Sequence, residues 1–147
     1  MNIKRLLKLQ LGEAMSIFND PFTYVGLAKV QLDSGHTLRW FYDDEQQLLS
    51  VDPKDDELVL FEELEDELEP EDEIIVFQGK EYEFDYEDAG NVLETEGEAE
   101  TDEGDRLLFS DYQTKGGEII RLIENENTGE SSVYLGRYVT EEDIMEM

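Results

Sequence analysis

The sequence contains no cysteine and only one histidine among its 147 residues. Without cysteine the chain has no disulfide bond, no thiolate nucleophile and no cysteine-ligated zinc or iron–sulfur site. The one histidine, His36, follows Ser34-Gly35 in a predicted hairpin turn. A histidine in a turn is expected to be solvated, and a Ser–His–Asp triad would have to use this residue. We therefore predict no catalytic residue.

Basic residues are scarce, with 11 Lys and Arg against 40 Asp and Glu, so the net charge is −29. This balance excludes DNA and RNA as ligands, because nucleic-acid binding depends on Lys and Arg that neutralise phosphates. The charge is uneven: residues 1–40 carry +2, residues 41–105 carry −26 and residues 106–147 carry −5. The acidic middle segment therefore dominates the electric field, and it favours a cationic partner.

Long apolar runs are also missing. No stretch approaches the roughly 20 apolar residues that a transmembrane helix needs, and Lys8 and Gln10 interrupt the apolar part of the basic N-terminal segment. The segment therefore lacks the uninterrupted apolar region of a signal peptide. We expect no transmembrane segment and a cytoplasmic location.

Motifs for cofactors and metals are absent as well. Neither GxGxxG nor GxxxxGK[ST], the two common phosphate-binding motifs, occurs in the chain. No window beginning at Asp43, Asp52, Asp88 or Asp102 has the ligand spacing and central glycine of an EF-hand. We therefore expect no cofactor, and loose uptake of divalent ions in place of a specific metal site.

Aromatic residues, by contrast, make up 10% of the chain and occur in short runs of β type. Such runs favour a folded domain, because disordered acidic segments contain few aromatic residues. Turn signals follow about every ten residues, which is typical of antiparallel strands joined in a meander. Strands are predicted at residues 14–18, 22–30, 36–42, 47–51, 58–61, 74–77, 80–84, 91–96, 107–112, 118–124 and 132–139.

This pattern predicts a mainly β fold, with two meander-like or roll-like halves of short antiparallel strands and a short N-terminal helix. Residues 1–12 form the basic helix, residues 13–66 the first half, residues 67–73 an acidic linker and residues 74–147 the second half, within one compact domain. The helix is either an amphipathic anchor for a membrane or partner, or it docks on the acidic body of its own chain, which we favour.

Four segments have a distinctive pattern: Trp40-Phe41-Tyr42-Asp43-Asp44, Leu48-Leu49-Ser50-Val51, Glu57-Leu58-Val59-Leu60-Phe61 and the Phe77-Gln78-Gly79-Lys80-Glu81-Tyr82 hairpin. In these segments the chain resembles a bacterial family known as DUF4178, a domain of unknown function. The resemblance spans about residues 11–140. The shared positions are packing and turn residues, so the resemblance implies a fold and transfers no catalytic residue. The chain also resembles accessory proteins, and this resemblance implies a partner-binding role.

Alternation of aromatic and acidic residues indicates a candidate binding surface. Tyr82 and Tyr86 alternate with Glu83 and Asp85, so that rings and carboxylates point to opposite faces of a strand. Most rings are expected in the core, but any ring left exposed beside carboxylates would bind cations through its π face. The candidate residues for a cation or partner surface are Trp40, Tyr42, Asp43, Asp44, Tyr82, Glu83, Asp85 and Tyr86.

The sequence thus favours a non-enzymatic acidic binding or adaptor module that interacts with a basic protein or a cationic ligand such as a polyamine. One alternative is a hydrolase that acts on a neutral substrate through a carboxylate pair, which requires one carboxyl group in an apolar setting. Another is that the acidity serves solubility only. The sequence leaves the oligomeric state open, because exposed edges of a meander can pair.

Overall fold

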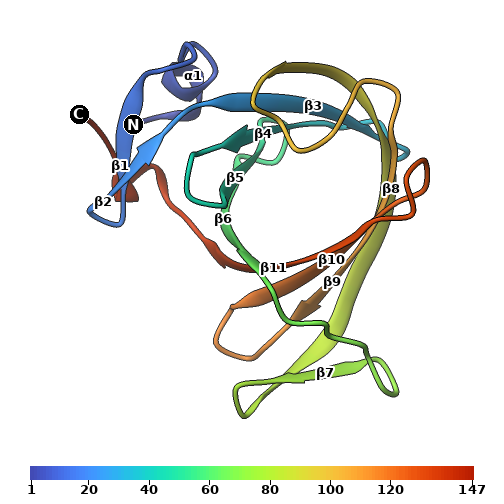
Figure 1. The fold of residues 1–147 in the computed structure, drawn as a ribbon. Helices are drawn as coiled ribbons and strands as arrows, with labels where there is room; N and C mark the ends of the chain where they lie inside the picture. The colour runs from blue at the N-terminus through green and yellow to red at the C-terminus, as the bar shows by residue number, and fades with distance from the viewer.

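The computed structural model describes residues 1–147 and consists mainly of β-strands (Figure 1). The elements in chain order are α1 (Ile3–Leu6), β1 (Ala14–Ile17), β2 (Asp20–Thr23), β3 (Gly26–Leu32), β4 (Thr37–Tyr42), β5 (Gln47–Asp52), β6 (Glu57–Leu64), β7 (Ile74–Phe77), β8 (Lys80–Gly97), β9 (Arg106–Gln113), β10 (Ile119–Asn125), β11 (Ser131–Tyr138), the 3-10 turn η1 (Glu141–Asp143) and β12 (Ile144–Glu146). The predicted mainly β class with a short N-terminal helix is confirmed.

Eight antiparallel strands close into a barrel in the order β3-β4-β5-β6-β11-β10-β9-β8, and β8 pairs back onto β3. Figure 1 shows these strands as a ring, with β7 attached outside it to β8. The predicted arrangement as two meander-like or roll-like halves is therefore wrong. Strands from the two parts of the chain pair at two places, β6 with β11 and β3 with β8. This closure pairs the backbone N–H and C=O groups of strand edges that two separate sheets would leave unpaired.

The longest strand, β8, has 18 residues and makes one of these two pairings. Its first part pairs with β7 and β9, and its last part pairs with β3. Gly90 lies at the crossover, where a Cβ atom would come within 2.8 Å of the Gln31 carbonyl oxygen. The sequence predicts two strands here because Asp88-Ala89-Gly90 disfavours β structure, but the ladder with β9 carries the strand through this segment.

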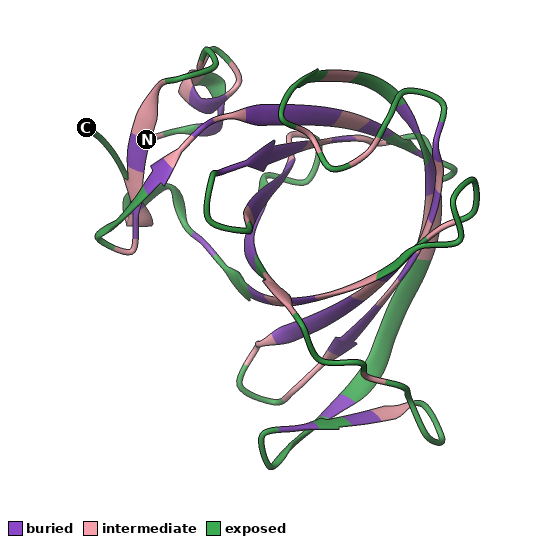
Figure 2. Cartoon of the chain, in the orientation of Figure 1, coloured by how far each residue is buried: buried purple, intermediate pink, exposed green.

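The barrel interior holds one apolar core. Leu38, Trp40 and Tyr42 of β4 share its face, as the period-two pattern predicts, while Phe41 points outward. Figure 2 shows buried segments along most of the ring. The interior residues are Ala28, Val30, Leu32, Leu38, Trp40, Tyr42, Leu48, Val59, Phe61, Val92, Leu107, Phe109, Ile119, Ile123 and Tyr134.

A second core lies outside the barrel, where α1 and the small sheet β12-β1-β2 cover the strands β4 to β6. Ile3 and Leu6 of α1 are buried there, and the guanidinium of Arg5 donates to Glu146 at 2.6 Å. The helix thus docks on its own chain, although it has four residues where a longer helix was predicted. No helix combines the length and the apolar character needed to cross a membrane.

A third, smaller core joins β7 and the first part of β8 to the outer faces of β9 and β10. Its buried members are Ile75, Phe77, Tyr82, Tyr112 and Ile120. Leu64 and Leu68, from the end of β6 and the acidic segment that follows it, pack against this core. The acidic segment is therefore tied to the barrel wall by its leucines, while most of its carboxylates are exposed.

Replacing Gly136 by alanine is expected to lower the free energy of unfolding by about 1–3 kcal/mol, because the added methyl group overpacks the core. A Cβ atom at Gly136 would overlap the ring of Phe61, which is fully buried, and would crowd Val59 Cγ1 at 3.1 Å. Urea denaturation measures the change. The matched control is Gly116→Ala, since nothing lies within 4 Å of a Cβ atom there. Equal stability of the two variants would contradict this packing.

Candidate functional site

The two ends of the barrel differ in access. At one end the loop of residues 98–105 packs across the interior core through Ala99. The hydroxyl of Tyr134 donates to Glu100 Oε2 of this loop at 2.8 Å. Burial and the nearby Glu100 carboxylate raise the pKa of Tyr134, so this phenol stays protonated as a donor. A small cavity of about 40 Å³ is left at this end.

The other end opens into a cavity of about 310 Å³, which we call the mouth. It is bordered by the β3–β4 and β5–β6 turns and by the middle of β8. The end of β9, the start of β10 and the end of β11 complete its lining. Arg121 and His36 are the basic side chains that line it. The acidic residues that line it are Asp52, Asp55, Glu57, Asp85, Asp88 and Asp111.

Arg121 forms the floor of the mouth together with Asp111. Its Nε and Nη2 atoms donate to the Asp111 carboxylate at 2.7 and 2.8 Å, and its guanidinium lies 4.5 Å from the ring centroid of Phe61 and 4.9 Å from that of Phe109. Burial acts to lower the pKa of Arg121, but Asp111, with smaller contributions from Tyr86 and Glu57, outweighs it and the pKa is raised. The third guanidinium nitrogen, Nη1, is buried without a hydrogen-bond partner.

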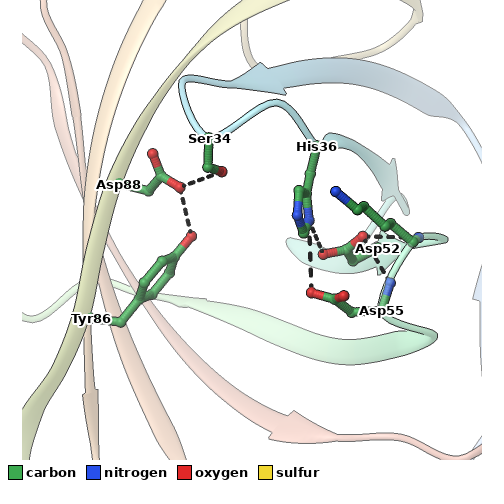
Figure 3. A network of polar contacts seen from close by, with 7 residues as sticks. Ser34, His36, Asp52, Asp55, Tyr86 and Asp88 are labelled. Carbon is green, nitrogen blue, oxygen red and sulfur yellow. Dashed lines mark hydrogen bonds and ion pairs between the residues drawn. The ribbon is translucent and has the colours of Figure 1, made fainter.

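One wall of the mouth carries His36 between two carboxylates (Figure 3). Its Nδ1 atom lies 3.1 Å from Asp52 Oδ2 and 3.7 Å from Asp55 Oδ2. The other oxygen of Asp52 accepts from the backbone N–H groups of Lys54 at 3.1 Å and Asp55 at 3.4 Å. The turn between β5 and β6 therefore fixes the Asp52 carboxylate with Oδ2 directed at the imidazole.

The facing wall carries Asp88, whose Oδ2 atom accepts from Ser34 Oγ at 3.1 Å and from the hydroxyl of Tyr86 at 3.2 Å (Figure 3). Burial raises the pKa of Tyr86, and the Asp88 carboxylate adds to it, so the phenol remains a donor. At the rim, partial loss of hydration raises the pKa of Glu57; Asp52 adds to this effect and Arg121 opposes it. The mouth is therefore a concave, mostly anionic site.

A second concavity, of about 1130 Å³, runs along the outer wall of the barrel, and we call it the outer groove. It lies between the acidic segment of residues 63–70 and the outward faces of β8 to β11. Leu108, Leu122 and Val133 form its apolar floor. The lining includes nine Asp and Glu residues and no Lys, Arg or His; one of these acids, Asp33, is paired with Arg106 at 2.6 Å.

The aromatic residues predicted for a binding surface lie at three different places. Trp40 and Tyr42 are in the barrel interior, and Tyr82 is buried in the third core. Tyr86 lines the mouth beside Asp85, so these two predicted residues are brought together. The ring faces of Trp40, Tyr42 and Tyr82 are therefore packing surfaces.

The remaining predicted acids are separated from the mouth. Asp43 is buried in the β4–β5 turn, where its Oδ1 accepts from the N–H groups of Glu45 at 2.9 Å and Gln47 at 2.8 Å, and burial raises its pKa. Asp44 and Glu83 are exposed, the first in the same turn and the second in β8. Asp43 thus stabilises a turn, as Asp commonly does.

Sequence reasoning missed the pairing of His36 with Asp52 and of Arg121 with Asp111. A signal for the first pair was present, because a hairpin of residues 36–42 and 47–51 brings residue 36 beside residues 52–55. Arg121 was missed because it interrupts an apolar strand of Ile and Leu, and its acidic partner is one of 40. Adjacent strands β9 and β10 place Arg121 directly opposite Asp111.

The family model for DUF4178, a domain of unknown function, matches residues 11–141. The chain therefore belongs to this family, as its strand and turn residues indicate. A search of curated proteins found no match, and a search of solved structures found none either. The family description names no activity, so the function has to be argued from the mouth and the outer groove.

Proposed function

We propose that this protein is a non-enzymatic binding module whose outer groove takes up a basic, amphipathic segment of a partner protein. The observation that supports this proposal is the combination of an apolar floor with nine acidic and no basic residues in one concavity. Charge complementarity selects a basic segment, and the leucine and valine side chains of the floor select one with an apolar face.

The acidic field and the apolar floor contribute differently to binding. Exposed charges interact weakly one by one, but their summed field accelerates the encounter with a cation by roughly ten- to thousand-fold at low salt. Burial of Leu108, Leu122 and Val133 contributes about 25 cal/mol per Å² of apolar surface and is insensitive to screening. Raising the salt concentration should therefore weaken binding strongly without abolishing the preference for an apolar face.

The test compares two synthetic peptides of equal length and positive charge by fluorescence anisotropy. One is an amphipathic Leu/Lys peptide and the other has Ser in place of Leu. We expect the amphipathic peptide to bind at least tenfold more tightly, and its affinity to fall by at least tenfold between about 0.05 and 0.5 M NaCl as the Debye length shortens. Equal affinity of the two peptides would contradict use of the apolar floor.

A pair of variants localises the binding. Leu122→Lys places a positive charge on the half-buried floor of the groove, whereas Leu93→Lys changes an exposed leucine outside it. We expect the first variant to bind the amphipathic peptide at least tenfold more weakly and the second to bind as the parent protein does, with circular dichroism confirming that both fold. If spermidine displaces the peptide at near-stoichiometric concentration, a small polycation is the better ligand and the proposal fails.

A further inference from the structure

We propose that the barrel mouth holds a specific site for one divalent transition-metal ion, with His36, Asp52 and Asp55 as its protein ligands. The three side chains converge from the segment before β4, the end of β5 and the β5–β6 turn. One ligand atom from each lies within 4.8 Å of the other two. This site is separate from the outer groove, and its test does not depend on peptide binding.

The spacing of the ligand atoms fits a small cation. Zinc binds imidazole nitrogen and carboxylate oxygen at about 2.0–2.2 Å, so two ligand atoms in a tetrahedral site are about 3.3–3.5 Å apart. The distances from His36 Nδ1 to Asp52 Oδ2 and to Asp55 Oδ2, 3.1 and 3.7 Å, bracket this range. Modest side-chain adjustment therefore brings three ligands onto one ion.

Two of the three ligands are also held in place before any ion arrives. The backbone N–H groups that bind Asp52 Oδ1 leave Oδ2 for the metal, and the side chains of His36 and Asp52 are only 20% and 15% exposed, whereas that of Asp55 is 58% exposed. The partial burial of His36 and Asp52 distinguishes this cluster from the many fully exposed carboxylates, whose ion uptake is diffuse. One imidazole with two carboxylates favours zinc, cobalt or manganese over calcium and magnesium, which prefer oxygen ligands.

An independent observation indicates that the mouth accepts a ligand. Arg121 lines the same cavity, its side chain is only 6% exposed, and its Nη1 atom lacks a hydrogen-bond partner. A buried guanidinium nitrogen without an acceptor is destabilising, so the cavity favours an occupant that supplies an oxygen. Three protein ligands leave a coordination position open on the ion, and an oxygen ligand at that position would lie in the same cavity that Arg121 lines.

The test uses the fact that His36 is the only histidine, so the imidazole region of a ¹H–¹⁵N NMR spectrum reports on one residue. Zinc chloride is titrated into the full chain with magnesium in large excess, which saturates diffuse binding to exposed carboxylates. We expect the His36 resonances to shift and to stop shifting at one equivalent of zinc. Imidazole resonances that do not move would overturn the proposal.

Three variants distinguish zinc binding at this site from diffuse binding to surface carboxylates. Asp52→Asn removes a ligand charge but keeps the oxygen that receives the Lys54 and Asp55 N–H groups, so the turn is preserved. We expect it to weaken zinc binding at least tenfold by isothermal titration calorimetry, and Asp55→Asn to do the same. The control Asp44→Asn removes an exposed carboxylate from another turn and should leave the affinity unchanged. Equal losses in all three variants would show that uptake is diffuse.

Discussion

Replacing Asp111 by alanine is expected to lower the free energy of unfolding by about 3–5 kcal/mol, the usual effect of removing one partner from a buried ion pair. Arg121 keeps its charge in this variant, because a guanidinium is not deprotonated in proteins. It would then be a buried cation beside the rings of Phe61 and Phe109, with Nε and Nη2 deprived of their acceptor in addition to the unpartnered Nη1. Urea denaturation followed by circular dichroism measures the loss.

Two comparisons make this result specific to the buried charge. Glu118→Ala breaks the exposed ion pair with Lys80 and should leave the denaturation midpoint nearly unchanged. The double variant Asp111→Leu with Arg121→Met replaces both charges by apolar groups, and it should be more stable than Asp111→Ala alone. If Asp111→Ala were as stable as Glu118→Ala, the bidentate pair at the floor of the mouth would not exist in solution.

Replacing Trp40 by alanine is expected to destabilise the fold by a similar amount, about 3–5 kcal/mol, through lost burial and the cavity left behind. Trp40 is 1% exposed, and its ring meets that of Phe109 edge to face, with centroids 6.4 Å apart. The cavity would lie in the middle of the barrel, where strands paired on both sides restrict collapse. The control Tyr138→Ala removes a ring that is 45% exposed and should have a much smaller effect.

The fluorescence of the parent protein provides a second measurement, since Trp40 is the only tryptophan. An indole inside the barrel should emit at short wavelength and resist quenching by iodide until urea unfolds the chain. Emission at the wavelength of free tryptophan in water, or strong quenching in the folded state, would show that Trp40 is exposed to solvent. This outcome would contradict the barrel interior described above.

Local sequence patterns predicted those parts of the fold that local physics determines. The alternation of Leu38, Trp40 and Tyr42 correctly predicted the face of β4 that is buried. Gln78-Gly79, with positive φ angles of 51° and 77°, forms the expected tight turn between β7 and β8. Thr140 begins a helical turn of the same local kind, with the Asp143 carboxylate accepting from its N–H group at 2.9 Å. Each of these features depends on residues within about six positions of one another.

The closure of the barrel and the composition of the mouth could not be predicted in this way. Pairing of β3 with β8 joins residues about 60 to 70 positions apart, and no local pattern specifies which distant strands meet. The mouth brings together side chains from all eight barrel strands and two turns, and any two of 40 acids were equally good candidates before the register was known. The pairing of His36 with Asp52 was the one contact of the mouth that a local pattern could have indicated, because the two residues belong to one hairpin and lie within 20 positions of each other.

Barrel closure leaves β7 as the one strand of the larger sheet with a single partner. This strand is four residues long, and Glu71, Asp72 and Glu73 precede it directly. Two copies that approached each other edge to edge along β7 would bring these carboxylates together, and electrostatic repulsion would keep the molecules apart. Ionised acids therefore oppose edge-to-edge pairing along β7, and acidification toward the isoelectric point of about 4.1 is expected to weaken this repulsion.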